Sequence, residues 1–149
     1  MEYRTATTDD IPEMCRIRNL QLIDEGYDAF ADINSEMEDF FSRKLSDGSL
    51  VQWMAIDDGK IIATAAILFL EITPSFSHQN GLAGYITDMY TAPEYRRQGI
   101  ASNLLSKLRE EAERRGAKRL MLGASEYGKP VYRRFGFSDL EDWMDMHLD

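Results

Sequence analysis

Residues 96–101, with the sequence Arg-Arg-Gln-Gly-Ile-Ala, join two segments whose patterns predict different secondary structures. The apolar residues 84–91 before them are typical of a strand, which a proline-containing turn then ends. After them, residues 100–115 repeat apolar side chains at helical spacing. A strand that opens through a glycine loop into a helix leaves backbone N–H groups free at the positive end of the helix dipole. We therefore expect a phosphate or pyrophosphate site here, with Gly99 and Ala101 letting the ligand approach the backbone.

Short strands and helices alternate along the rest of the chain. Strands are expected at residues 3–7, 50–56, 61–72, 84–91 and 118–124, with one or two more within 137–148. Helices are expected from Asp10 to Gly26 and over residues 34–45, 100–115 and 129–135. The turn at 57–60 predicts an antiparallel hairpin, and residues 73–82 are typical of an exposed loop. Because a hairpin and a later strand–helix–strand unit occur together, we expect an α/β fold with a mixed sheet, in one domain over residues 1–149.

The composition argues against several classes of protein. A net charge of −9 makes a nucleic acid an unsuitable partner. No apolar run approaches the roughly 20 residues of a membrane span, and the first residues lack a signal-peptide pattern, so we expect a cytoplasmic protein with no membrane partner. The single cysteine, Cys15, lies on an apolar helix face and predicts a buried thiol. His78 and His147 are isolated, are expected to be solvated, and give no metal-ligand spacing.

Two motifs occur in order, separated by a helix and a strand. The first is Arg96-x-x-Gly99-x-Ala101, and the second is the run Tyr-Arg-Arg-Phe-Gly-Phe over residues 132–137. They resemble the pyrophosphate loop and the late tyrosine with its Gly-Phe pair in the GNAT superfamily of N-acetyltransferases. Many members of that family carry asparagine seven residues before the tyrosine and alanine four before it. Ser and Gly stand at these positions, 125 and 128, so we expect different contacts to the pantetheine arm.

The resemblance implies a GNAT-like acyl-CoA N-acyltransferase fold, with a mostly antiparallel sheet of about six to seven strands flanked by about four helices. It also implies acetyl-CoA as co-substrate and no metal. The residues that would hold this donor are Met89, Tyr90, Thr91, Arg96, Arg97, Gln98, Gly99, Ile100, Ala101 and Ser125. The strand end at 89–91 is expected to separate from its neighbour, and a backbone N–H near Met89 is expected to stabilise the oxyanion. Without a ligand, the loop would be an ordinary turn with exposed arginines.

Tyr132 is the candidate general acid under this resemblance. The departing coenzyme A is a thiolate with a pKa of about 8.5 to 10, and a phenol with a pKa of about 10 can protonate it at hydrogen-bond distance. The alternative is a core tyrosine that packs on Phe135 and Phe137. Tyr127 is a second candidate for the acid.

The general base has several candidates. Asp88 lies in an otherwise apolar strand, in phase with Ile86 and Tyr90, where burial would raise its pKa. Alternatively, Asp88 forms a hydrogen bond to a neighbouring loop or helix end. In that case Glu25 or Asp24, at the end of the first helix, would reach the acceptor, or a chain of water would serve as the base.

The resemblance implies an enzyme that moves the acetyl group of acetyl-CoA to a primary amine of a small molecule or peptide, by direct transfer in a ternary complex. The alternative is a non-catalytic acyl-CoA sensor of the same fold, against which Tyr132 argues. A kinase or ATPase is disfavoured because the loop lacks the Gly-Lys-Ser/Thr ending of triphosphate sites. A homodimer is compatible with the sequence, which leaves the acceptor amine open.

Overall fold

The computed structural model describes residues 1–148, which contain one five-stranded sheet. Its strands are β1 (Glu2–Thr5), β2 (Leu50–Asp57), β3 (Lys60–Glu71), β4 (Leu82–Thr91) and β5 (Arg119–Leu122), in this spatial order. β4 and β5 pair in parallel, whereas the other neighbouring strands are antiparallel. The predicted mixed sheet and the hairpin between β2 and β3 are therefore confirmed.

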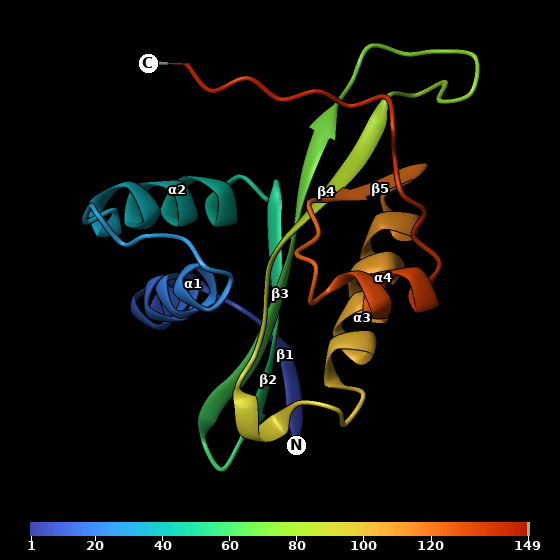
Figure 1. Cartoon of the computed structure of the whole chain (residues 1–149). Helices are drawn as coiled ribbons and strands as arrows, with labels where there is room; N and C mark the ends of the chain where they lie inside the picture. Colours follow the sequence, from blue (N-terminus) through green and yellow to red (C-terminus); the bar gives the residue numbers. More distant parts are fainter. Residues whose placement is uncertain (149) are drawn as a thin grey trace.

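Helices cover both faces of the sheet (Figure 1). α1 (Ile11–Asp24) and α2 (Asn34–Ser46) lie on one face, and α3 (Ile100–Arg114) and α4 (Lys129–Phe135) lie on the other. The short 3-10 helices η1 (Thr8–Asp10) and η2 (Pro93–Tyr95) precede α1 and α3. α2 and α3 agree to within a residue with the ranges predicted from helical periodicity.

The larger part of the hydrophobic core lies between α3 and the sheet. The apolar stripe of α3 is fully or almost fully buried and consists of Ile100, Leu104, Leu105, Leu108 and Ala112. It packs on β3, where the small side chains of Ala63 and Ala65 let the helix approach the sheet closely. Each buried leucine stabilises the fold by about 1.5–3 kcal/mol, so this contact firmly fixes the first turn of α3 relative to the sheet.

A β-bulge changes the course of β4 near its end. Thr64 of β3 lies opposite Tyr90, and Ala66 lies opposite Thr87, so two residues of β4 face a single residue of β3. Asp88, inside the bulge, has a φ of 56°, a left-handed conformation that residues other than glycine rarely adopt. The regular alternation of side chains between the two faces of the sheet, which was expected for this strand, is therefore interrupted at Asp88.

β4 and β5 separate after a short stretch of pairing. The last paired residues are Ile86 and Leu122. From there β4 continues toward η2, while the chain after β5 turns toward α4 (Figure 1). The expected separation of the strand end at residues 89–91 is thus confirmed.

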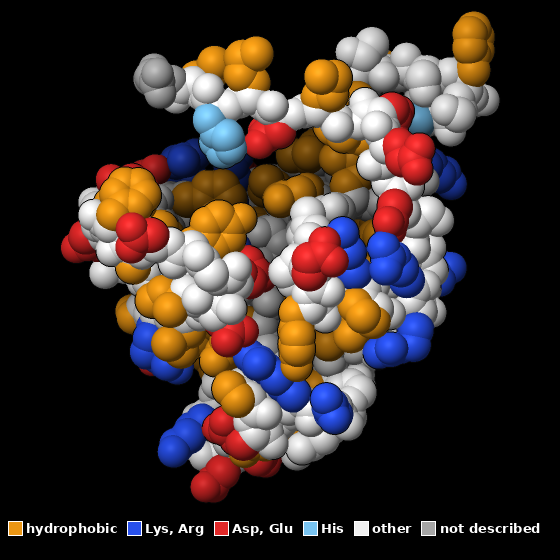
Figure 2. Space-filling view, viewed as in Figure 1, with side chains coloured by type: hydrophobic (Ala, Val, Ile, Leu, Met, Phe, Trp, Pro, Cys, Tyr) orange, Lys and Arg blue, Asp and Glu red, His pale blue; other side chains and the backbone are white. Residues whose placement is uncertain are grey.

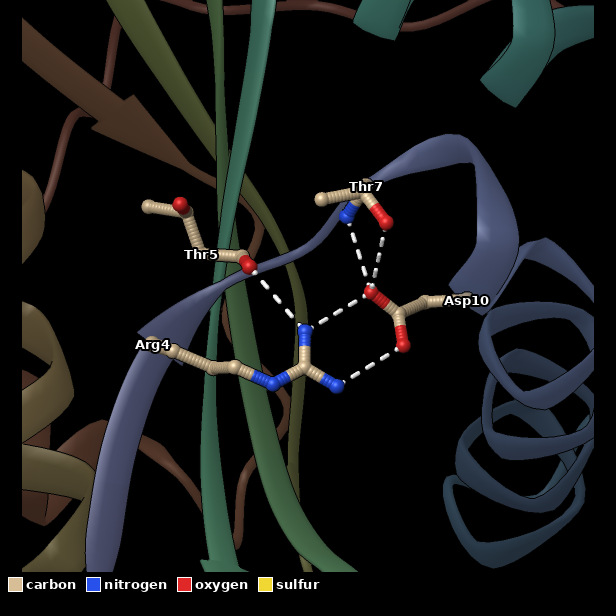
Figure 3. A network of polar contacts seen from close by, with 4 residues as sticks. All are labelled: Arg4, Thr5, Thr7 and Asp10. Atoms are coloured by element: carbon tan, nitrogen blue, oxygen red, sulfur yellow. Dashed lines mark hydrogen bonds and ion pairs between the residues drawn. The ribbon is translucent and has the colours of Figure 1, made fainter.

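A polar network ties the end of β1 to the start of the first helical segment (Figure 3). The guanidinium of Arg4 donates two hydrogen bonds to the Asp10 carboxylate, at 2.8 and 2.9 Å. The same carboxylate accepts a bond of 2.8 Å from the backbone N–H of Thr7. The Arg4 hydrogen bond lowers the pKa of Asp10 below its ordinary value, against the opposing effect of burial.

The strands expected within residues 137–148 are absent, so this prediction was wrong and the sheet has five strands instead of six to seven. A strand forms only where it pairs with another, and this segment pairs with no strand among the described residues. Phe137 packs against the core, whereas the apolar side chains after it, among them Trp143 and Met144, are exposed.

Two predictions of burial are confirmed and one is wrong. Cys15 is buried and His147 is exposed, as expected. His78, expected to be solvated, is only 9% exposed, and its Nε2 lies 2.8 Å from the carbonyl oxygen of Leu82. The ring thereby helps to close the otherwise exposed loop between β3 and β4.

Candidate active site

Two cavities meet where β4 and β5 separate. The larger has a volume of about 990 Å³ and lies along the end of β4, the start of α3 and α4. The smaller, of about 390 Å³, lies between the end of α1 and the strands β4 and β5. The residues that line both are Gln21, Glu25, Met89, Ser125 and Tyr132. Figure 2 shows this face of the molecule, hollowed between the α1–α2 side and the α3–α4 side.

The predicted phosphate loop forms one end of the larger cavity. Arg97 and Gly99 have φ values of 64° and 79°, and these two left-handed residues turn the chain into α3. The first hydrogen bond of α3 runs from the N–H of Asn103 to the carbonyl of Gly99, so the amides of residues 100–102 have no partner within the helix. A Cβ added at Gly99 would meet no atom within 4 Å, so the loop is open to a ligand.

Most of the predicted donor-binding residues line this cavity. They are Met89, Tyr90, Thr91, Arg96, Arg97, Gly99, Ile100, Ala101 and Ser125. Gln98 is not among the lining residues, and its side chain points back to the carbonyl oxygen of Glu94. The structure therefore brings together residues from β4, α3 and two loops that were predicted from the sequence to hold one ligand.

Arg96 connects three parts of the cavity wall. Its Nε donates to the carbonyl oxygen of Thr91 at 2.9 Å, and its Nη2 forms an ion pair of 2.9 Å with Asp24 at the end of α1. Its guanidinium also lies over the rings of Tyr90 and Tyr127. These contacts engage Arg96 in holding the loop against β4 and α1, and the neighbouring Arg97 also lines the cavity.

Tyr132, on α4, borders both cavities. Its ring packs edge-to-face on Phe137, with centroids 6.1 Å apart. A Cβ at Gly128 would lie 2.8 Å from Cε2 of Tyr132, so the glycine is required for this ring position. Burial, with a smaller contribution from the carboxylate of Glu25, raises the pKa of Tyr132 to about 12. The phenol therefore stays protonated at neutral pH.

Asp88 lies in the wall of the smaller cavity and is 6% exposed. Its Oδ1 is 3.3 Å from Nη1 of Arg18 on α1, and the hydroxyl of Thr87 donates to the same oxygen at 3.3 Å. Burial raises the pKa of Asp88, and Arg18 and Thr87 oppose this effect. The alternative interpretation expected a hydrogen bond from Asp88 to a neighbouring loop or helix end, whereas the contact found is an ion pair with Arg18 in the middle of α1. The role of Asp88 as a base stays a prediction.

The acidic end of α1 reaches the site, as the sequence analysis proposed. Glu25 lines both cavities and accepts a hydrogen bond of 3.2 Å from Gln21. Asp24 lines only the larger cavity, where Arg96 neutralises it. Tyr127, the second candidate acid, lines the larger cavity but is 73% exposed.

Two residues that line the smaller cavity, Arg18 and Gln21, were not predicted from the sequence. Both project from the face of α1 that also carries the buried Met14 and Ile17. A long polar side chain in such an apolar stripe is the signal that would have identified them, because buried polar groups need partners.

Two kinds of feature are absent from residues 1–148. No helix in this range is long and apolar enough to cross a membrane. No group of three or more histidine, cysteine, aspartate or glutamate side chains within it is arranged to hold a metal ion.

Comparison with known proteins gives consistent matches. The family model described as Acetyltransferase (GNAT) family matches residues 12–137. A crystal structure of a predicted acetyltransferase with acetyl-CoA, from Clostridium acetobutylicum, is 42% identical with a TM-score of 0.96, and the match covers 98% of this chain and 95% of that one. A GCN5-related N-acetyltransferase from Ralstonia eutropha JMP134 is 30% identical with a TM-score of 0.91, over 98% and 97% of the two chains.

Curated relatives match over shorter stretches. A glucosamine 6-phosphate N-acetyltransferase from Trypanosoma brucei brucei is 30% identical over 60% of this chain and 59% of its own length. A thialysine N-epsilon-acetyltransferase from Bos taurus is 34% identical over 49% of this chain and 45% of its own length. The matched region thus spans about half of these relatives.

Proposed function

This chain belongs to the acetyltransferase (GNAT) family, and we propose that it transfers the acetyl group of acetyl-CoA to a primary amine of a small molecule. The observation that carries this proposal is the meeting of two cavities at the separated strands β4 and β5, with Tyr132 bordering both. One cavity suits a long donor that bears a pyrophosphate, and the other suits a compact acceptor. The names of the two curated relatives, which act on glucosamine 6-phosphate and thialysine, support a small-molecule amine.

The donor fits the larger cavity for two reasons. Its volume of about 990 Å³ lies at the upper end of the range usual for ligand sites. The unpaired amides at the start of α3 and the side chain of Arg97 would hold the pyrophosphate at one end. The pantetheine arm would then run along residues 89–91, with its thioester near Tyr132. The acetyl-CoA in the Clostridium structure supports this choice of donor.

The proposed transfer is a direct attack of the neutral amine on the thioester carbonyl. The N–C bond forms as the carbonyl oxygen takes up negative charge, which the backbone N–H of Met89 would stabilise. The C–S bond then breaks, and the departing thiolate takes a proton from the hydroxyl of Tyr132. The amine proton leaves to a base, and solvent returns a proton to the tyrosine.

Glu25 is the base that the geometry favours over Asp88. Glu25 is exposed at the junction of the two cavities, where a water molecule can link its carboxylate to the amine. Asp88 is buried, and Arg18 and Thr87 hold the same oxygen of its carboxylate. We therefore propose that Glu25 accepts the proton and that Asp88 maintains the shape of the β4 bulge.

Release of free thiol from acetyl-CoA tests the function directly, with a panel of amines that includes diamines, an amino sugar phosphate, thialysine and a peptide. Turnover that depends on one class of amine and on Tyr132 supports the proposal. Tight binding of acetyl-CoA by calorimetry, with no turnover for any amine, would instead support the acyl-CoA sensor.

A further inference from the structure

Three polar side chains on one face of α1, those of Arg18, Gln21 and Glu25, form a hydrogen-bonded ladder that ends at the proposed base. They are three and four positions apart, so each lies one turn of the helix from the next. Nη1 of Arg18 donates to Oε1 of Gln21 at 3.0 Å, and Nε2 of Gln21 donates to Oε1 of Glu25 at 3.2 Å. All three side chains line the smaller cavity.

The two ends of the ladder fix the orientation of the Gln21 amide. The guanidinium of Arg18 can only donate hydrogen bonds, and the ionised carboxylate of Glu25 can only accept them. The amide oxygen must therefore face the arginine, and the amide nitrogen must face the glutamate. Gln21 is only 6% exposed, so leaving either of its groups without a partner would be costly. A single orientation of the amide satisfies both ends.

The arginine end of the ladder is anchored to the sheet. The same Nη1 of Arg18 lies 3.3 Å from Oδ1 of Asp88, which is buried inside the bulge of β4. Asp88 is followed directly by Met89, whose backbone N–H is the proposed oxyanion donor. The ladder therefore runs from the strand that would stabilise the oxyanion to the carboxylate that would take up the amine proton.

The glutamate end depends on the ladder for its position. Glu25 is exposed and follows the last residue of α1, where the negative end of the helix dipole disfavours a carboxylate. Within residues 1–148, its side chain accepts a hydrogen bond only from Gln21, and this bond engages Oε1. The bond restricts the rotamers of a long exposed side chain and leaves Oε2 available for a proton.

We propose that Gln21 is a positioning residue, which orients the carboxylate of Glu25 toward the acceptor amine. This inference rests on the proposed acetyl transfer and on the assignment of Glu25 as its base. Gln21 and Glu25 both line both cavities, so the amide holds the carboxylate at the junction where donor and acceptor would meet. The charged donor Arg18 polarises the amide and thereby strengthens its bond to the glutamate. Gln21 itself exchanges no proton during the reaction.

Gln21→Met tests the proposal, because methionine keeps the length and helix propensity of glutamine and removes both hydrogen bonds. The kcat/KM for the amine should fall about tenfold or more, since a displaced base loses part of its effect. The affinity for acetyl-CoA, measured by calorimetry, should change little. A variant with the native kcat/KM would overturn the proposal.

Asn19→Leu is the matched control for a general disturbance of α1. Its amide donates to the carbonyl of Cys15 and to the side chain of Asn34, at 3.2 and 3.1 Å, and it lines neither cavity. The leucine variant should lose stability in urea unfolding but turn over at the native rate. If it is as slow as Gln21→Met, the loss comes from a loosened helix and not from the orientation of Glu25.

The double variant Gln21→Met/Glu25→Gln shows whether Gln21 acts through the glutamate. If it does, Gln21→Met should cause little further loss once the carboxylate is gone, so the two effects should not add. A further loss of tenfold in the double variant would mean that Gln21 acts independently, which contradicts the proposal. A native rate for Glu25→Gln would remove the base and this inference, but leave the transfer function standing. A native chain that acetylates no amine would refute the proposed function, and the inference with it.

Discussion

The hydroxyl of Thr64 donates a 2.8 Å hydrogen bond to the backbone carbonyl of Asp88, and both groups are buried. The bond joins β3 to β4 inside the bulge, at the residue whose backbone is left-handed. Arg18 holds the side chain of the same aspartate from α1. Thr64 and Arg18 thus fix the bulge from two sides, and the bulge determines how Met89 enters the site.

Thr64→Val should destabilise the fold and slow the reaction. Valine has the same shape but leaves the carbonyl of Asp88 buried without this donor, which we expect to lower the free energy of unfolding by about 1–3 kcal/mol. The turnover number should fall more than the KM for acetyl-CoA rises, because the bulge positions the reacting carbonyl and not the pyrophosphate. Urea unfolding and steady-state kinetics measure the two effects.

Thr64→Ser is the control for this prediction, since it retains the hydroxyl. It should restore most of the turnover, although it creates a small cavity. A valine variant that unfolds at lower urea concentration but turns over at the native rate would limit Thr64 to a structural role.

Tyr132→Phe should lower the turnover number by about 10²-fold while the affinity for acetyl-CoA changes little. The substitution keeps the ring that packs on Phe137 and removes only the proton donor. Because the pKa of the tyrosine is raised to about 12, the phenol stays protonated throughout the neutral range. The loss should therefore be nearly constant between about pH 6 and 9 in a pH–rate profile.

Gly128→Ala offers a second measurement on the same side chain. The added Cβ would lie 2.8 Å from the tyrosine ring and must displace it, so the rate should fall although the hydroxyl is present. If both variants turn over normally while the chemical step limits the rate, Tyr132 is a packing residue.

Glu25→Gln should lower kcat/KM for the amine, because the base that accepts the amine proton is lost. The expected decrease is about 10²-fold, as for other positioned bases. Asp88→Asn is the comparison, and its effect should appear mainly as lower stability, since Arg18 loses its charged partner. A large loss of turnover in the asparagine variant, with a normal rate for the glutamine variant, would assign the base to Asp88.

Local patterns predicted the loop and α3 well, because both depend on short-range rules. Gly99 has the left-handed φ that a helix entry of this kind requires, and the apolar stripe of α3 follows from periodicity alone. Contacts between distant segments followed no local rule. The ion pair between Arg96 and Asp24 joins residues that are 72 positions apart, and nothing in either segment specifies the other.

The C-terminal segment shows a different limit of such prediction. Its alternation of apolar and polar residues correctly describes a chain able to form a strand, but a strand also needs a neighbour. No strand among the described residues pairs with it, so the pattern did not lead to a strand.

Asp10→Asn should destabilise the protein at neutral pH by about 1 kcal/mol, since the Arg4 side chain is partly exposed and solvent weakens the pair. Hydrogen bonding to Arg4 lowers the pKa of Asp10 in the folded state below its ordinary value of 3.8. Its contribution is therefore fully present above this ordinary value and is lost as the pH falls through the lower pKa of the folded state. Thermal unfolding should show the two proteins converging in acid, and a difference that persists undiminished at the lowest pH would contradict this account.

Gly99→Glu should abolish the binding of coenzyme A, because its carboxylate would extend into the space where the pyrophosphate is expected. The backbone at Gly99 has a φ of 79°, so any side chain also adds strain of about 1–2 kcal/mol. Gly99→Ala is the matched control, since it carries that strain without the charge, and its Cβ meets no atom within 4 Å. Calorimetry should show binding to the alanine variant and none to the glutamate variant, with both folded by circular dichroism. Equal affinity in the two variants would mean that the start of α3 does not hold the pyrophosphate, and the donor would then have to enter the larger cavity in another orientation.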